Sequence, residues 1–154
     1  IMDRGLKVSK KTMLDVLDAF NAYFKEKGTQ NITYLEFSNY IENNGGGFIN
    51  YFNELGDILG KLGEITSKLK LPILSTIIVN SGDELPAPGY FRMAALHSVY
   101  TRHDKQLDIK KNSQLENLTR KKRIEFIKEQ KNLLRNLKDS DFERIIEEIS
   151  LKYQ

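Results

Sequence analysis

The chain has 154 residues, a formal net charge of +3 and no cysteine. Without cysteine there are no disulfides, thiol nucleophiles or thiolate metal sites, and the length is typical of one domain with a sizeable core. No segment approaches the roughly eighteen apolar residues of a membrane span, and residues 1–11 lack the apolar stretch of a signal peptide. We therefore expect no membrane partner and a cytoplasmic location.

Charge is distributed unevenly along the chain. Residues 31–60 hold four acidic and no basic residues, whereas residues 102–138 hold twelve basic and five acidic residues. A basic block in a nearly neutral protein favours a polyanion or an acidic partner. A solvated helix face is the more ordinary explanation of such a charge run.

Two helices are predicted in the N-terminal part. Residues 10–27 repeat apolar side chains every three to four positions, and Gly28 is a typical stop signal. Thr33 and Glu36 have the spacing of a capping box, in which each side chain bonds the other residue's backbone amide. This motif predicts a second helix over residues 33–43.

A third helix is predicted over residues 48–70, directly after Gly45-Gly46-Gly47. We expect these glycines to form a turn and not a phosphate site, because no lysine follows in P-loop position and the segment is acidic. The stripe that we expect this helix to bury consists of Tyr51, Phe52, Leu55, Ile58, Leu59, Leu62, Ile65 and Leu69.

Three further glycines, Gly56, Gly60 and Gly63, share one face of that predicted helix. Each costs up to ~1 kcal/mol of helix propensity relative to alanine. Close packing of a neighbouring helix would explain them, and so would the approach of a nucleic-acid backbone or another ligand. The sequence leaves both explanations open.

The strongest strand pattern is the β-branched run at residues 74–80, which follows Pro72. Turn-forming residues come next at 80–83, then a proline-rich loop and a short apolar segment at 90–92. We interpret these segments as a small β-hairpin whose return strand is residues 90–92.

The remaining chain is predicted to be helical at residues 92–103, at 113–138 and from Ser140 onward. The last helix carries an apolar stripe that either packs internally, which we favour, or forms a homodimer. Its residues are Phe142, Ile145, Ile146 and Ile149.

The order of these elements is that of a winged helix, whose third helix enters the DNA major groove. We expect a mainly α fold with a small β-hairpin, made of a winged-helix-like domain at residues 1–104 and a C-terminal helical pair at 105–154, packed as one domain. Asparagine can read adenine, and lysine or arginine can hold phosphates. The candidate DNA contacts are Asn43, Asn44, Asn50, Asn53, Lys61, Lys68, Lys70, Ser81, Arg120, Lys121, Lys122 and Arg123.

Several short motifs within residues 31–92 carry a family resemblance. Thr33-Tyr34, Ile58-Leu59-Gly60-Lys61-Leu62, a proline-led strand and Gly89-Tyr90 resemble the DNA-binding half of the alkylguanine-DNA alkyltransferases and alkyltransferase-like proteins. Ser75 stands where that family has its alkyl-accepting cysteine, so alkyl transfer is excluded. The resemblance then implies binding of damaged bases without chemistry. The block LPILSTIIVNSGDELPAPGYF is also similar to a pattern of small uncharacterised bacterial proteins, which implies a bacterial or phage origin.

No Walker loop, G-x-S-x-G or H-E-x-x-H motif is present, so we expect no cofactor and no metal. A non-enzymatic protein is favoured, and enzymatic activity stays open as the last of three hypotheses. The first hypothesis is a DNA-binding protein in regulation or in restriction and defence, although Glu54 and Asp57 on the proposed reading helix would repel phosphates. The alternative is a protein-interaction module, such as a phage inhibitor or a toxin-system component. The third is a metal-dependent nuclease that uses His103 and Asp104.

Overall fold

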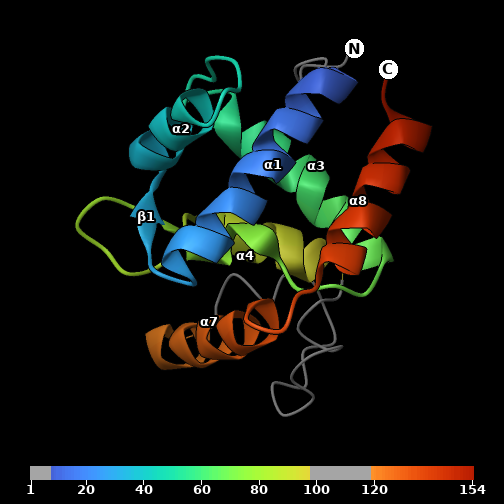
Figure 1. The fold of residues 1–154 in the computed structure, drawn as a ribbon. Coiled ribbons are helices and arrows are strands. Elements are labelled where there is room, and N and C mark those ends of the chain that lie inside the picture. The colour runs from blue at the N-terminus through green and yellow to red at the C-terminus, as the bar shows by residue number, and fades with distance from the viewer. Residues whose placement is uncertain (1–7, 98–118) are drawn as a thin grey trace, which may run out of the picture.

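The computed structural model describes residues 8–97 and 119–154, and these residues form a mainly helical fold with one small sheet (Figure 1). The predicted fold class, mainly α with a small β component, is confirmed. The elements are α1 (Lys10–Lys27), β1 (Ile32–Thr33), α2 (Tyr34–Asn43), α3 (Leu55–Lys68), the 3₁₀ helix η1 (Leu74–Ile77), β2 (Ile78–Val79), α4 (Pro88–Leu96), α7 (Arg120–Leu134) and α8 (Asp139–Lys152).

The first two helices have the predicted ends. The amide of Thr12 donates to the Ser9 hydroxyl at the start of α1, over 3.1 Å, and Gly28 ends the helix with φ of 65°. The capping box of α2 is present in both directions: Glu36 N donates to Thr33 Oγ1 over 3.2 Å, and Thr33 N donates to Glu36 Oε1 over 3.0 Å. Local hydrogen bonding therefore determines where these helices begin and end.

Helix α3 starts seven residues later than the sequence predicts, at Leu55 instead of residue 48. Residues 48–54 form a loop because polar side chains capture backbone amides that a helix would use. The amide of Asn50 donates to Glu54 Oε1 over 2.7 Å, and the amide of Phe52 donates to Asn50 Oδ1 over 2.8 Å. The loop is also tied to α2, since the Ser38 hydroxyl donates to the carbonyl oxygen of buried Ile49.

The sheet pairs β1 with β2 in parallel, with Ile32 opposite Ile78 and Thr33 opposite Val79. The strand at 78–79 lies inside the predicted range, but its partner is β1 and not residues 90–92, so the described residues contain no antiparallel hairpin. Residues 90–92 belong to α4, because Pro88 at its first turn has a backbone preset for a helix. Parallel pairing needs a long crossover, which α2 and α3 provide.

Two groups of buried side chains form the core. The first is built mainly from α1, α2, α3 and α8, and the second from α4, α7 and the segments around η1. Figure 1 shows α8 packed along α1, and the amide of Lys10 at the start of α1 donates to the carbonyl of Gln154 over 2.7 Å. Helices α7 and α8 therefore share their cores with the rest of the chain.

The apolar stripe of α8 packs internally. Phe142, Ile145 and Ile149 are buried in the first core, and only Ile146 is exposed, at 37%. A homodimer through these four residues would have one exposed apolar side chain available on each copy. None of the helices in the described ranges is long and apolar enough to cross a membrane.

Replacing Phe20 tests the first core. Its ring is fully buried, and its centroid lies 4.5 Å from that of Phe37. We expect Phe20→Ala to lower the free energy of unfolding by about 3–5 kcal/mol, because it leaves a cavity between α1 and α2. The matched control is Leu151→Ala, whose side chain is 78% exposed and whose substitution should change stability by less than about 0.5 kcal/mol. Urea unfolding measures both, and equal effects would contradict this core assignment.

Candidate functional site

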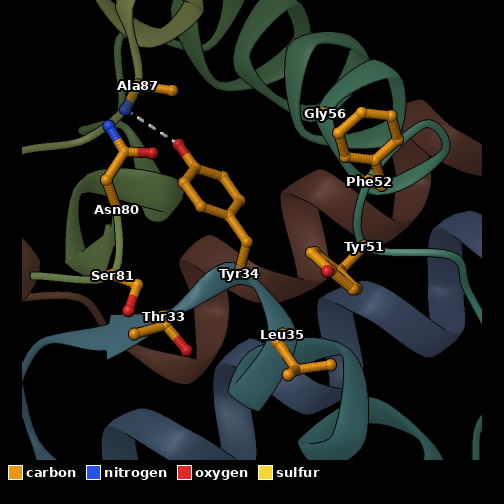
Figure 2. Close-up of a pocket in the computed structure, with 9 residues that line it drawn as sticks. All are labelled: Thr33, Tyr34, Leu35, Tyr51, Phe52, Gly56, Asn80, Ser81 and Ala87. Carbon is orange, nitrogen blue, oxygen red and sulfur yellow. Dashed lines mark hydrogen bonds between the residues drawn. The ribbon is translucent and has the colours of Figure 1, made fainter.

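A pocket of about 630 Å³ opens between the start of α2, the loop at residues 48–54 and the loop after β2 (Figure 2). We call it the outer groove. Its walls are largely apolar, with polar side chains from the loop after β2 on one side. The lining residues are Thr33, Tyr34, Leu35, Tyr51, Phe52, Gly56, Asn80, Ser81 and Ala87.

Large apolar side chains stand exposed at this groove. Phe52 is 85% exposed, Tyr51 is 45% exposed and Leu35 is 49% exposed, and Phe48 on the same loop is 71% exposed. We call the three of these residues that line the groove, Phe52, Tyr51 and Leu35, the aromatic face. Clustered exposure of this kind marks interaction surfaces, whereas single exposed apolar residues are normal.

The sequence pattern assigned Tyr51 and Phe52 to a buried helical stripe, and this assignment is wrong. Both side chains belong to the loop before α3 and point outward. Asn50 and Glu54 could have indicated a loop in the sequence, because their side chains are spaced to accept hydrogen bonds from nearby backbone amides.

A second pocket of about 240 Å³ adjoins the outer groove and shares Tyr34, Gly56 and Ala87 with it. We call it the inner pocket. Its other lining residues are Leu59, Gly60, Ser75, Gly89, Tyr90 and Met93. Tyr34 therefore stands where the two pockets meet.

The position of Tyr34 is set by one hydrogen bond. Its phenolic oxygen accepts from the amide of Ala87 over 3.0 Å, as Figure 2 shows. Burial raises the pKa of Tyr34, and the hydrogen bond from Ala87 opposes part of that shift. The phenol is therefore neutral near pH 7 and keeps its proton as a hydrogen-bond donor.

The three glycines of α3 divide into two kinds. A Cβ atom at Gly63 would lie 2.5 Å from the Sδ atom of Met93, so this glycine permits close packing of α3 against α4. A Cβ atom at Gly56 or Gly60 would meet nothing within 4 Å. Packing within the described residues thus explains Gly63 and leaves Gly56 and Gly60, which line the inner pocket, without a structural reason.

Helix α3 turns most of its surface inward. Its buried residues lie on several sides, and its exposed positions are Gly56, Glu64 and Lys68. Two of the lysines predicted to hold phosphates are paired within the protein: Lys61 Nζ lies 4.0 Å from Asp57 Oδ2, and Lys68 Nζ lies 2.9 Å from Glu148 Oε1. Lys70, the third, follows the helix with φ of 60°. This arrangement offers little of α3 to a DNA groove.

The predicted asparagine contacts are scattered. Asn43 and Asn44 are exposed at the end of α2, and Asn53 is exposed beside the aromatic face. The side-chain oxygen of Asn50 accepts a hydrogen bond from the amide of Phe52, in the same loop. Ser81 lines the outer groove.

The amides of the triple glycine after α2 form hydrogen bonds within the protein. The amide of Gly47 donates to Asp15 Oδ2 over 3.3 Å, and the amide of Gly46 donates to the carbonyl of Ile41 over 3.0 Å. Because these amides already have acceptors in the chain, the segment is a turn, as the sequence predicts.

Helix α7 carries a basic surface. Arg120, Lys121, Lys122 and Lys128 are exposed, and so is Arg135 at its C-terminal end. Arg123, the other predicted contact in this run, is half-buried with its guanidinium 4.7 Å from the ring centroid of Phe91.

Two side chains of α7 contact other parts of the chain. Arg120 pairs with Asp83 over 3.2 Å, and Lys131 Nζ donates to Asn31 Oδ1 over 2.5 Å. The first contact joins α7 to the loop that lines the outer groove.

No group of three or more His, Asp or Glu side chains placed to hold a metal ion occurs in the described part of the chain. His103 and Asp104, the residues of the nuclease hypothesis, lie outside the described residues.

Comparison with known proteins adds no relative. No protein-family model matches the chain, and no curated protein or solved structure matches it significantly. The similarity to alkyltransferase-like proteins therefore remains a resemblance in short motifs. Ser75, which replaces the cysteine of that family, lies on η1 and lines the inner pocket.

Alanine substitutions distinguish the two kinds of glycine. We expect Gly60→Ala to raise the free energy of unfolding by up to ~1 kcal/mol, because alanine favours the helix and its methyl group has open space. Gly63→Ala should be clearly less stable than Gly60→Ala, since Met93 must move aside. Urea unfolding of both variants measures the difference, and equal stabilisation would contradict the packing role of Gly63.

Proposed function

We propose that this protein is a non-enzymatic interaction module that binds a protein partner on its aromatic face. The observation that carries the proposal is the exposure of Phe52, Tyr51 and Leu35 on a loop and a helix start that the fold holds in place. Aromatic anchors in such positions dominate the free energy of protein–protein binding.

Burial of the exposed rings against a partner would favour binding. Burial of apolar surface contributes about 25 cal/mol per Å², and aromatic side chains bury about 150–250 Å² each. The loop needs little ordering on binding, because Asn50, Glu54 and Ser38 already fix its backbone. Such preorganisation lowers the entropic cost of association.

Photochemical cross-linking tests this function. The photoreactive amino acid p-benzoylphenylalanine is placed at Phe52 in one variant and at Leu151 in the control, because both side chains are highly exposed but only Phe52 belongs to the aromatic face. In native cells, we expect a covalent adduct of one defined mass from position 52 and none from position 151. Mass spectrometry then identifies the attached chain.

Three outcomes contradict the proposal. No adduct at position 52, or the same adducts from both positions, would show that the aromatic face has no specific partner. An adduct of twice the chain mass would show self-association. As a control, an excess of untagged wild-type protein should compete for the partner and reduce the adduct. An excess of the untagged Phe52→Ser variant should reduce it only weakly.

A second candidate function is binding of nucleic-acid phosphates by α7. The specific observation is that Arg120, Lys121, Lys122, Lys128 and Arg135 are exposed there, while Glu125 is the exposed acid. Phosphate contacts of this kind supply sequence-independent affinity.

Fluorescence anisotropy with a labelled DNA duplex tests this second candidate. We expect binding that weakens steeply with salt, and we expect Lys121→Glu and Lys122→Glu each to weaken it and to lower the salt slope by about one. Lys27→Glu on α1 makes the same charge change on another exposed surface and should have a much smaller effect. No binding at low salt, or equal loss from all three variants, would exclude a DNA site on α7.

A further inference from the structure

We propose that the inner pocket is an anchor site for one aromatic side chain with a polar tip, such as tyrosine, presented by a lysine- or arginine-rich segment of the partner. This inference rests on the proposed function, and it adds the chemistry of the partner and the place where it is held.

The inner pocket has room for such a ring. Its volume is about 240 Å³, and a cavity of about 150 Å³ suffices to bind benzene. Leu59, Met93 and the ring of Tyr90 supply apolar walls. The pocket opens toward the outer groove through their shared residues, so a segment lying across Phe52 can insert one side chain past Tyr34.

Two polar groups in the pocket have unused hydrogen-bonding capacity. Ser75 is only 8% exposed, and its hydroxyl has no hydrogen-bond partner among the described residues. Tyr34 accepts from Ala87 but its own proton has no acceptor in the same part of the structure. Both residues line the pocket and each hydroxyl can take a further hydrogen bond, so they favour a ligand whose tip can both donate and accept.

Two glycines of α3 independently point to the inner pocket as a binding site. Gly56 and Gly60 lower helix stability and meet no neighbouring atom that a Cβ would displace. Both line the pocket. Side chains at these positions would fill the space that the anchor occupies, which is a reason for glycine that packing does not supply.

The charge of the groove selects a cationic partner. The two segments that provide most of its lining, residues 33–60 and 80–89, contain no lysine or arginine. Their acidic residues are Glu36, Glu42, Glu54, Asp57, Asp83 and Glu84. Lys61 and Arg120 each pair with one of these carboxylates, which leaves an excess of four negative charges (six minus two). This excess attracts lysine and arginine and repels phosphates, so the observations favour a basic peptide over a nucleic acid with an inserted base.

Selection from random peptides displayed on phage tests the inference. We expect the enriched peptides to share one tyrosine or other polar-tipped aromatic residue flanked by lysine or arginine. Synthetic copies that carry a tryptophan next to the motif can be titrated by fluorescence, because the protein itself contains no tryptophan.

Three variants assign the contacts. Gly60→Leu fills the inner pocket from an open position and should weaken peptide binding at least about tenfold, which is ~1.4 kcal/mol. Phe52→Ser should weaken binding by removing the outer contact. Ser75→Ala should abolish the preference for a tyrosine peptide over its phenylalanine analogue. Urea unfolding of each variant confirms that the fold is retained.

The results separate the anchor site from the proposed function. Peptides that lose affinity for Phe52→Ser but bind Gly60→Leu and wild type equally would overturn the anchor site and leave the aromatic face as the docking surface. Enrichment of acidic peptides, no enrichment at all, or Gly60-dependent binding of a single-stranded oligonucleotide in place of peptides would overturn the inference. The cross-linking at Phe52 tests the function without reference to the pocket.

Discussion

The burial of α3 is the constraint on which the rest of this structure depends. Leu55, Ile58 and Leu62 face the first core, while Gly63 lets α4 approach closely enough for Met93 to contact the helix backbone. Helix α8 packs on α3 as well. Helix α3 thus lies in the first core and contacts α4 of the second. Figure 1 shows it between α1 and α8.

This central position determines what remains available for binding. A helix enclosed in this way presents a narrow strip to solvent, and the charges on that strip are paired: Lys61 with Asp57, Glu64 with Lys152 and Lys68 with Glu148. Such exposed pairs contribute little to stability, typically below about 1 kcal/mol, but they leave few free cations for phosphates. The surface available to a partner moves to the loop before α3, where the aromatic face stands.

The outer groove and the inner pocket follow from the parallel pairing of β1 with β2. That pairing brings the start of α2 beside the loop after β2, so that Tyr34 meets Ala87 across 53 positions of sequence. An antiparallel hairpin would have directed the same loop away from α2. The small sheet thus positions the groove, although it contributes only two residues from each strand.

The sequence by itself determined the helical class, both ends of α1 and α2, the turn at the triple glycine and which residues form the apolar stripe of α8. These features depend on local signals: capping side chains, glycines at stops and apolar periodicity. Tertiary structure alone decided the partner of β2. The start of α3 and the exposure of Tyr51 and Phe52 were missed because they depend on local bonds of polar side chains that the apolar pattern does not show. Apolar spacing cannot distinguish a buried stripe from an exposed loop when Asn50 and Glu54 bond the backbone instead. Nor can it reveal that Gly56 and Gly60 face open space, because that depends on which elements pack against α3.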